Sequence, residues 1–155
     1  MSLFPESSEL PGGRAVLLSI KPKYADLILA GTKKVELRRS WPSDDIGVMV
    51  LYSSSPVQRL VGIAYVDRVN EADVTGLWQL ARDYGGGVTH DELVEYLSGK
   101  KTAYGIMIKN SKTAQCAVDP KELFSDFNPP QSFQYLTPEE FQRVMRTIFP
   151  QEQLV

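Results

Sequence analysis

The residues best suited to chemistry lie in one short segment, 31–38, which reads Gly-Thr-Lys-Lys-Val-Glu-Leu-Arg. A strand over 33–38 would place Glu36 and Arg38 on one face, because successive side chains of a strand alternate. A charge-assisted hydrogen bond between them would orient the Arg38 guanidinium toward a phosphate or a base edge. Lys33 would stand at the mouth of that face. The segment predicts a site for an anionic ligand, and the alternative is an ion pair that only holds the strand.

Further candidates for the same ligand lie elsewhere in the chain. Lys21 precedes a predicted helix, whose first N–H groups can receive an anion. Gln131 and Ser132 offer neutral donors and acceptors for a base edge, and Tyr24, Tyr52 or Phe133 could stack on a base. The spacing of Tyr24 with Leu27 and Ile28 is equally typical of a core position. The predicted ligand-binding residues are Lys21, Lys33, Glu36, Arg38, Arg39, Tyr52, Ser53, Gln131 and Ser132.

Charge is distributed unevenly along the chain. Segment 14–39 holds seven basic and two acidic residues, a local charge of +5, although the 155-residue chain has a net charge of −2. Such an asymmetry can orient an anionic ligand toward one segment. It predicts a basic cleft, and the alternative is a set of solvated charges with no ligand.

Several classes of protein are excluded by composition. Cys116 is the only cysteine and His90 the only histidine, so no disulfide and no zinc site of the usual spacing is expected, and no metal or cofactor is predicted. No stretch approaches the roughly 20 apolar residues of a membrane span, and the N-terminus lacks a signal-peptide pattern. We therefore expect a cytoplasmic protein without a membrane partner.

The elements that must position these residues follow from periodicity and turn signals. Residues 1–14 lack apolar periodicity and predict a flexible arm, which leaves 15–150 as one domain. After Asn110 the pattern weakens to a helical turn near 123–127 and an extended segment over 129–136. Predicted strands are 15–20, 33–38, 48–52, 59–67 and 104–108, and predicted helices are 22–30, 73–84, 89–97 and 138–149.

This order of elements predicts an α+β fold. Five to six short strands with flanking helices are typical of a small mixed β-barrel. A doubly wound parallel sheet agrees less well, since the second, third and fourth strands follow one another without an intervening helix.

The segment 31–38 resembles the signature of the ASCH domain, G-x-K-x-x-E-x-R, at all four of its defined positions. The flanking motifs SIKPKYA, YSSSP, AYGI and PQSF are similar to features of one branch of that family, stand-alone proteins labelled predicted transcriptional regulators. The resemblance covers about Val16 to Leu136. It implies a PUA-like β-barrel with a cleft beside the signature strand that binds RNA or a nucleotide, or acts on it.

The resemblance leaves the activity open. One branch of the superfamily removes the acetyl group from N4-acetylcytidine with a lysine and a threonine of the signature strand. Here Lys33 matches the lysine but Glu36 stands at the threonine position, so that activity is not expected. Binding of RNA or a nucleotide-like ligand is the leading hypothesis. The alternatives are a small hydrolase for RNA or a modified nucleoside, with Lys33 and Glu36 as the reacting pair, and a regulatory module that binds a metabolite or a protein.

Overall fold

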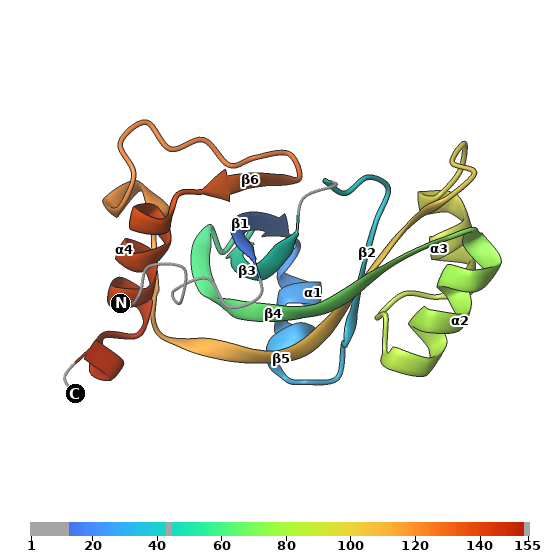
Figure 1. The fold of residues 1–155 in the computed structure, drawn as a ribbon, viewed down its shortest axis with the longest axis horizontal. Coiled ribbons are helices and arrows are strands. Elements are labelled where there is room, and N and C mark those ends of the chain that lie inside the picture. The colour runs from blue at the N-terminus through green and yellow to red at the C-terminus, as the bar shows by residue number, and fades with distance from the viewer. Residues whose placement is uncertain (1–12, 43–44, 154–155) are drawn as a thin grey trace.

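A computed structural model describes residues 13–42 and 45–153 of the chain. It shows one six-stranded sheet accompanied by four α-helices (Figure 1). The strands are β1 (Arg14–Ile20), β2 (Val35–Arg38), β3 (Ile46–Ser53), β4 (Arg59–Ala72), β5 (Ala103–Val118) and β6 (Phe133–Leu136). The helices are α1 (Pro22–Leu29), α2 (Val74–Tyr84), α3 (His90–Tyr96) and α4 (Pro138–Ile148), with 3-10 turns at Pro120–Glu122 and Pro150–Gln153.

The strand order in the sheet is β2-β5-β4-β3-β1-β6. Neighbours are antiparallel except β1 and β3, which are parallel because the chain passes through α1 and β2 between them. The predicted α+β class and the upper strand number are confirmed. The expected closure into a barrel is not, since β2 and β6 are the two edges of the sheet.

Strands β4 and β5 form a long ribbon that runs the length of the molecule (Figure 1). Both are longer than predicted, because their polar outer halves carry no apolar alternation and are held by backbone pairing along the partner strand. The two strands approach closely at Gly62, where a Cβ would lie 2.4 Å from the Lys112 carbonyl oxygen. The ribbon carries α2 and α3 at one end and passes α4 at the other.

Apolar side chains cover both faces of the central strands. Along β1, Leu17 points into a cluster under α4, whereas Leu18 points into a second cluster around α1. A third cluster joins β2 and the end of β5 to α2 and α3. These two-sided strands explain the continuous apolar run of β1 in the sequence.

Most predicted boundaries agree with the structure to within one or two residues. Two helices begin with a capping box, Thr89 with Glu92 on α3 and Thr137 with Glu140 on α4. The start and the late part of the chain differ from expectation. Residues 1–12 of the expected arm lie outside the described residues, and Arg14 already belongs to β1.

Two local predictions were wrong. The signature strand begins at Val35 instead of Lys33, because Lys34 N–H bonds to the Tyr84 carbonyl at the end of α2. The helical turn expected over 123–127 is instead a 3-10 turn at Pro120–Glu122, capped by the Asp119 side chain. The segment 129–136 was expected to be extended, and its last four residues pair with β1 as strand β6.

Candidate ligand-binding cleft

A cleft of about 670 Å³ lies between the N-terminal end of α1, strand β2, helix α3 and the loop before β6. Segments far apart in the sequence meet there, since its walls come from residues 19–24, 33–38, 88–96 and 129–131. The lining residues are Ser19, Ile20, Lys21, Tyr24, Lys33, Glu36, Leu37, Arg38, Ser54, Val88, Glu92, Leu93, Glu95, Tyr96, Pro129, Pro130 and Gln131.

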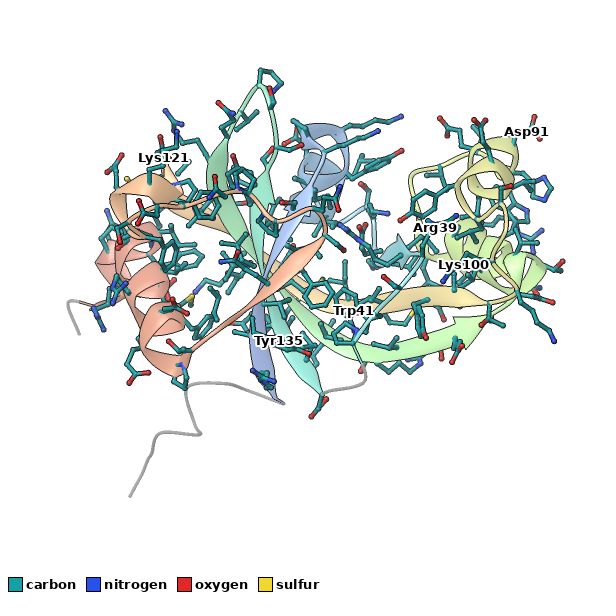
Figure 2. The ribbon with its side chains drawn as sticks, turned by 90° about the horizontal axis from the view of Figure 1, so that it is seen from above. Arg39, Trp41, Asp91, Lys100, Lys121 and Tyr135 are labelled. Atoms are coloured by element: carbon teal, nitrogen blue, oxygen red, sulfur yellow. The ribbon has the colours of Figure 1, made fainter. Side chains whose placement is uncertain are left out.

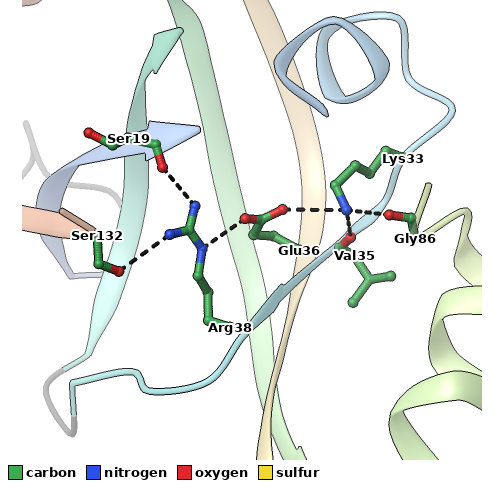
Figure 3. Close-up of polar contacts among 7 residues, drawn as sticks. All are labelled: Ser19, Lys33, Val35, Glu36, Arg38, Gly86 and Ser132. Atoms are coloured by element: carbon green, nitrogen blue, oxygen red, sulfur yellow. Dashed lines mark hydrogen bonds and ion pairs between the residues drawn. The ribbon is translucent and has the colours of Figure 1, made fainter. Parts of the chain in front are cut away.

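Glu36 lies between Lys33 and Arg38 of the signature segment (Figure 3). Its Oε1 is 3.3 Å from Lys33 Nζ, and its Oε2 accepts a 2.8 Å hydrogen bond from Arg38 Nε. The carboxylate side chain is only 7% exposed. The predicted pairing of Glu36 with Arg38 is therefore present, and Lys33 extends it to a triad with a formal charge of +1.

The Lys33 amine is enclosed by protein acceptors. Besides Glu36 it donates to the Val35 carbonyl at 2.8 Å and to the Gly86 carbonyl at 2.5 Å. Burial lowers the pKa of Lys33, and the neighbouring Glu36 opposes that shift. The expectation that Lys33 stands at the mouth of the site was wrong, because its three N–H groups face three acceptors of the protein.

The position of the Gly86 carbonyl depends on a glycine. A Cβ at residue 86 would lie 2.6 Å from the Ala81 Cβ, so only glycine lets this loop pack against α2. The Lys33 hydrogen bond to Gly86 thus ties the signature strand to the connection between α2 and α3.

Arg38 forms hydrogen bonds with three protein partners, and some of its guanidinium N–H groups remain unused. Its Nη2 donates to the Ser19 carbonyl at 2.9 Å and its Nη1 to Ser132 Oγ at 3.3 Å, in addition to the bond to Glu36. A guanidinium has five N–H groups, so two remain for a ligand. Ser132 and Ser19 also join each other, through Ser19 N–H and the Ser132 carbonyl at 2.9 Å. The loop before β6 and the end of β1 therefore fix the orientation of the Arg38 guanidinium.

An aromatic side chain forms part of the α1 wall. Tyr24 is half-buried, and its ring centroid is 5.2 Å from Lys33 Nζ and 5.5 Å from Lys23 Nζ. Burial raises the pKa of the Tyr24 hydroxyl, with smaller contributions from Glu92 and Glu36. The structure thus places Tyr24 in the cleft, although its helical spacing in the sequence is equally typical of a core position.

Four predicted site residues lie outside the cleft lining: Arg39, Tyr52, Ser53 and Ser132, the last of which contacts the cleft only through its bond with Arg38. Tyr52 is 3% exposed and points to the α4 side of the sheet, where its ring lies 5.5 Å from the Phe127 ring. Ser53 is buried at the end of β3. Arg39 donates to the Tyr96 and Ser98 carbonyls at 2.7 and 3.0 Å, at the end of α3. Strand alternation explains why Tyr52 misses the cleft. Its side chain lies on the same face of β3 as that of Val50, toward α4.

Sequence reasoning missed the α3 wall of the cleft. Glu92, Leu93, Glu95 and Tyr96 all line it, yet they are more than 50 residues beyond the signature segment. Nothing in their local pattern distinguishes them from an ordinary surface helix. Only the packing of α3 beside β2 gives them a role.

The expected basic cleft was also wrong in its overall charge. Of the seven cations in segment 14–39, only Lys21, Lys33 and Arg38 line the cleft. They are matched by three carboxylates, Glu36, Glu92 and Glu95. The cleft is balanced in formal charge and divided into a cationic side and an acidic side.

Residues 13–42 and 45–153 contain neither a metal-binding group of side chains nor a membrane-spanning helix. No group of three or more His, Cys, Asp or Glu side chains is arranged there to hold a metal ion. Within the same ranges, no helix has both the length and the apolar character to cross a membrane.

A curated protein of Zymomonas mobilis subsp. mobilis, named ASCH domain-containing ribonuclease, is 27% identical to this chain over 143 residues. The match covers 89% of this chain and 95% of the relative. The crystal structure of ASCH from Zymomonas mobilis superposes with a TM-score of 0.78 at 26% identity, covering 85% of this chain and 94% of that one. A serine-to-alanine variant of the same protein gives a TM-score of 0.77 over 87% and 96% of the two chains, at 26% identity.

A more distant structure shares the fold alone. The N-terminal domain of McrB from Staphylothermus marinus superposes with a TM-score of 0.55 at 10% identity, covering 87% of this chain and 94% of that one. The model of the ASCH domain matches residues 18–112, more than half of the chain and the whole of the signature segment. The chain therefore belongs to the ASCH domain family, as its signature segment predicted.

Proposed function

We propose that this chain binds RNA by taking one nucleotide unit into the cleft between α1 and α3. The observation that carries the proposal is the state of Arg38, which is fixed by Glu36, Ser19 and Ser132 and still has two N–H groups for a ligand. A guanidinium held in this way is suited to the two oxygens of a phosphate.

The other lining groups are consistent with a nucleotide. Lys21 adds a second cation at the α1 end of the cleft, and Gln131 adds an amide that can donate and accept. Tyr24 and Tyr96 provide aromatic surface on the two walls. A volume of about 670 Å³ lies within the usual range for small-ligand sites. The balanced charge of the lining favours a single nucleotide unit over a long stretch of polyanion.

The proposal is tested by fluorescence anisotropy with short single-stranded RNA, duplex RNA and matched DNA, at low and at physiological salt. Arg38→Lys keeps the positive charge but removes the planar guanidinium, and Lys21→Ala removes a cation that lines the cleft. Lys34→Ala is the matched control, since Lys34 is an exposed cation of the same segment that does not line the cleft. We expect the first two variants to weaken salt-sensitive RNA binding and the control to preserve it. Equal affinity of all four proteins would refute the proposal.

Cleavage of RNA is a second candidate function, favoured by the relative from Zymomonas mobilis that is named a ribonuclease. The contacts of Lys33 support a positioning role for it, because its amine is already surrounded by three acceptors. Arg38 is the better candidate for stabilising charge that develops on a phosphate. Incubation of end-labelled RNA with the parent chain and with Arg38→Lys tests this, and intact RNA in both reactions would exclude it. Salt-independent binding of a non-nucleic ligand would instead support a regulatory module.

A further inference from the structure

The two sides of the cleft differ in charge in a way that bears on how a nucleotide would lie in it. Lys21 and Arg38 are on the side of α1 and β2, whereas Glu92 and Glu95 are on α3. Helix α3 has no lysine or arginine between His90 and Tyr96. A phosphate is therefore attracted to the first side and repelled by the second, so the base of a bound nucleotide points toward α3.

The two carboxylates of this wall are not equivalent. Glu92 Oε1 accepts a 2.8 Å hydrogen bond from the Thr89 backbone N–H in the capping box, and that bond lowers the pKa of Glu92. The backbone carbonyl of Glu95 accepts a hydrogen bond from the Ser98 N–H at 3.2 Å, but the Glu95 carboxylate has no hydrogen bond or ion pair to any part of the chain that the structure describes. Both of its oxygens are available, and an ionised carboxylate only accepts hydrogen bonds.

The wall that carries Glu95 is anchored at both ends. The capping box of Thr89 and Glu92 closes the start of α3, and Arg39 bonds to the Tyr96 and Ser98 carbonyls at its end. Leu93 is 1% exposed and fixes the inner side of the helix in the third apolar cluster. A carboxylate on such a fixed helix can discriminate between ligands by the position of their donors.

We infer that Glu95 determines base specificity by accepting hydrogen bonds from amino-bearing bases, guanine above all, and by disfavouring uracil. The inference rests on the proposed function. Guanine presents N1–H and its amino group side by side, which matches the two oxygens of a carboxylate. Cytosine and adenine present one amino group, whereas the single N–H of uracil lies between two carbonyl oxygens that the carboxylate repels.

The test compares short oligo-uridine RNAs in which one central base is uracil, guanine, cytosine or adenine. Anisotropy titrations use the full chain, Glu95→Gln and the control Asp91→Asn. Asp91 is on the same helix as Glu95, and Asp91→Asn removes the same charge. Asp91 does not line the cleft, and Figure 2 shows it at the outer end of the unit formed by α2 and α3. Circular dichroism and thermal unfolding establish that both variants remain folded.

The parent chain is expected to bind the guanine-containing RNA about tenfold more tightly than oligo-uridine. Glu95→Gln should bring that ratio close to one, while Asp91→Asn should leave it unchanged. Equal binding of all four RNAs by the parent would overturn the inference and leave the proposed function standing. So would a uniform gain of affinity in Glu95→Gln that salt suppresses, because that is general charge repulsion. Absence of any RNA binding by the parent would refute both.

Discussion

Arg38 Nε donates to Glu36 Oε2 over 2.8 Å, and this pair joins the cleft of the protein to its interior. On one side Glu36 meets the enclosed amine of Lys33, and on the other Arg38 reaches the Ser19 carbonyl and Ser132. The same carboxylate therefore neutralises the buried cation of Lys33 and orients the partly buried cation of Arg38, which lines the cleft. A change at Glu36 should accordingly affect both the stability of the fold and the proposed binding of a ligand.

Replacing Glu36 by glutamine should destabilise the fold. Lys33 is only 3% exposed. The change leaves its ammonium group without a counter-charge and close to the Arg38 guanidinium. Removing one partner of a buried ion pair lowers the free energy of unfolding by about 3 kcal/mol. Urea denaturation at neutral pH measures it. Glu95→Gln, an exposed change on the same cleft, is the control, and a similar small effect of both variants would contradict the prediction.

The stability of the fold should depend on pH through Lys33. Because burial lowers the pKa of Lys33 below its ordinary value of 10.5, the folded chain binds this proton more weakly than the unfolded chain. Between the lowered pKa and 10.5, the contribution of Lys33 to the free energy of unfolding therefore rises with pH.

The comparison of the parent with Lys33→Met isolates that contribution. The free energy of unfolding of the parent minus that of the variant should increase as pH rises from neutral toward 10.5. Burial raises the pKa of Tyr24, which acts in the opposite direction above 10.0, but this residue is present in both proteins. A difference that is constant with pH would show that Lys33 titrates alike in the folded and unfolded chains.

Ser132→Ala should weaken ligand binding more than it weakens the fold. Its hydroxyl accepts one 3.3 Å hydrogen bond from Arg38 Nη1, so its loss leaves the guanidinium with two of its three partners. We expect RNA affinity to fall about threefold, as for one weak hydrogen bond, with the free energy of unfolding unchanged within about 0.5 kcal/mol. Ser125→Ala, an exposed change in the same loop, should alter neither quantity. Unchanged RNA affinity in Ser132→Ala would show that this hydroxyl does not contribute to RNA binding.

Arg39→Ala should loosen the α3 wall. Arg39 bonds to the Tyr96 and Ser98 carbonyls, which the end of the helix leaves without intrahelical partners. Hydrogen exchange should accelerate at the amides of Leu97 and Lys100, and RNA affinity should fall because the cleft loses a fixed wall. Arg82→Ala removes an exposed arginine from α2 and should change neither. Unaltered exchange in Arg39→Ala would show that the capping box alone holds the helix.

The sequence alone determined the family and most elements of the fold. The ASCH signature, the two capping boxes and the apolar runs of β1 and β3 are local patterns, and each corresponds to its element in the structure. The pairing of Glu36 with Arg38 was predictable for the same reason, since strand alternation places residues two apart on one face.

The tertiary structure alone decided the composition of the cleft. Whether the Lys33 amine faces solvent or the Gly86 carbonyl depends on a glycine loop 53 residues away, and the acidic wall of Glu92 and Glu95 depends on where α3 packs. Closure of the sheet likewise depends on whether its edge strands meet, and β2 and β6 remain apart. Local patterns determine elements because their interactions span a few residues. The charge and shape of a cleft arise from contacts between distant segments, which only the folded chain specifies.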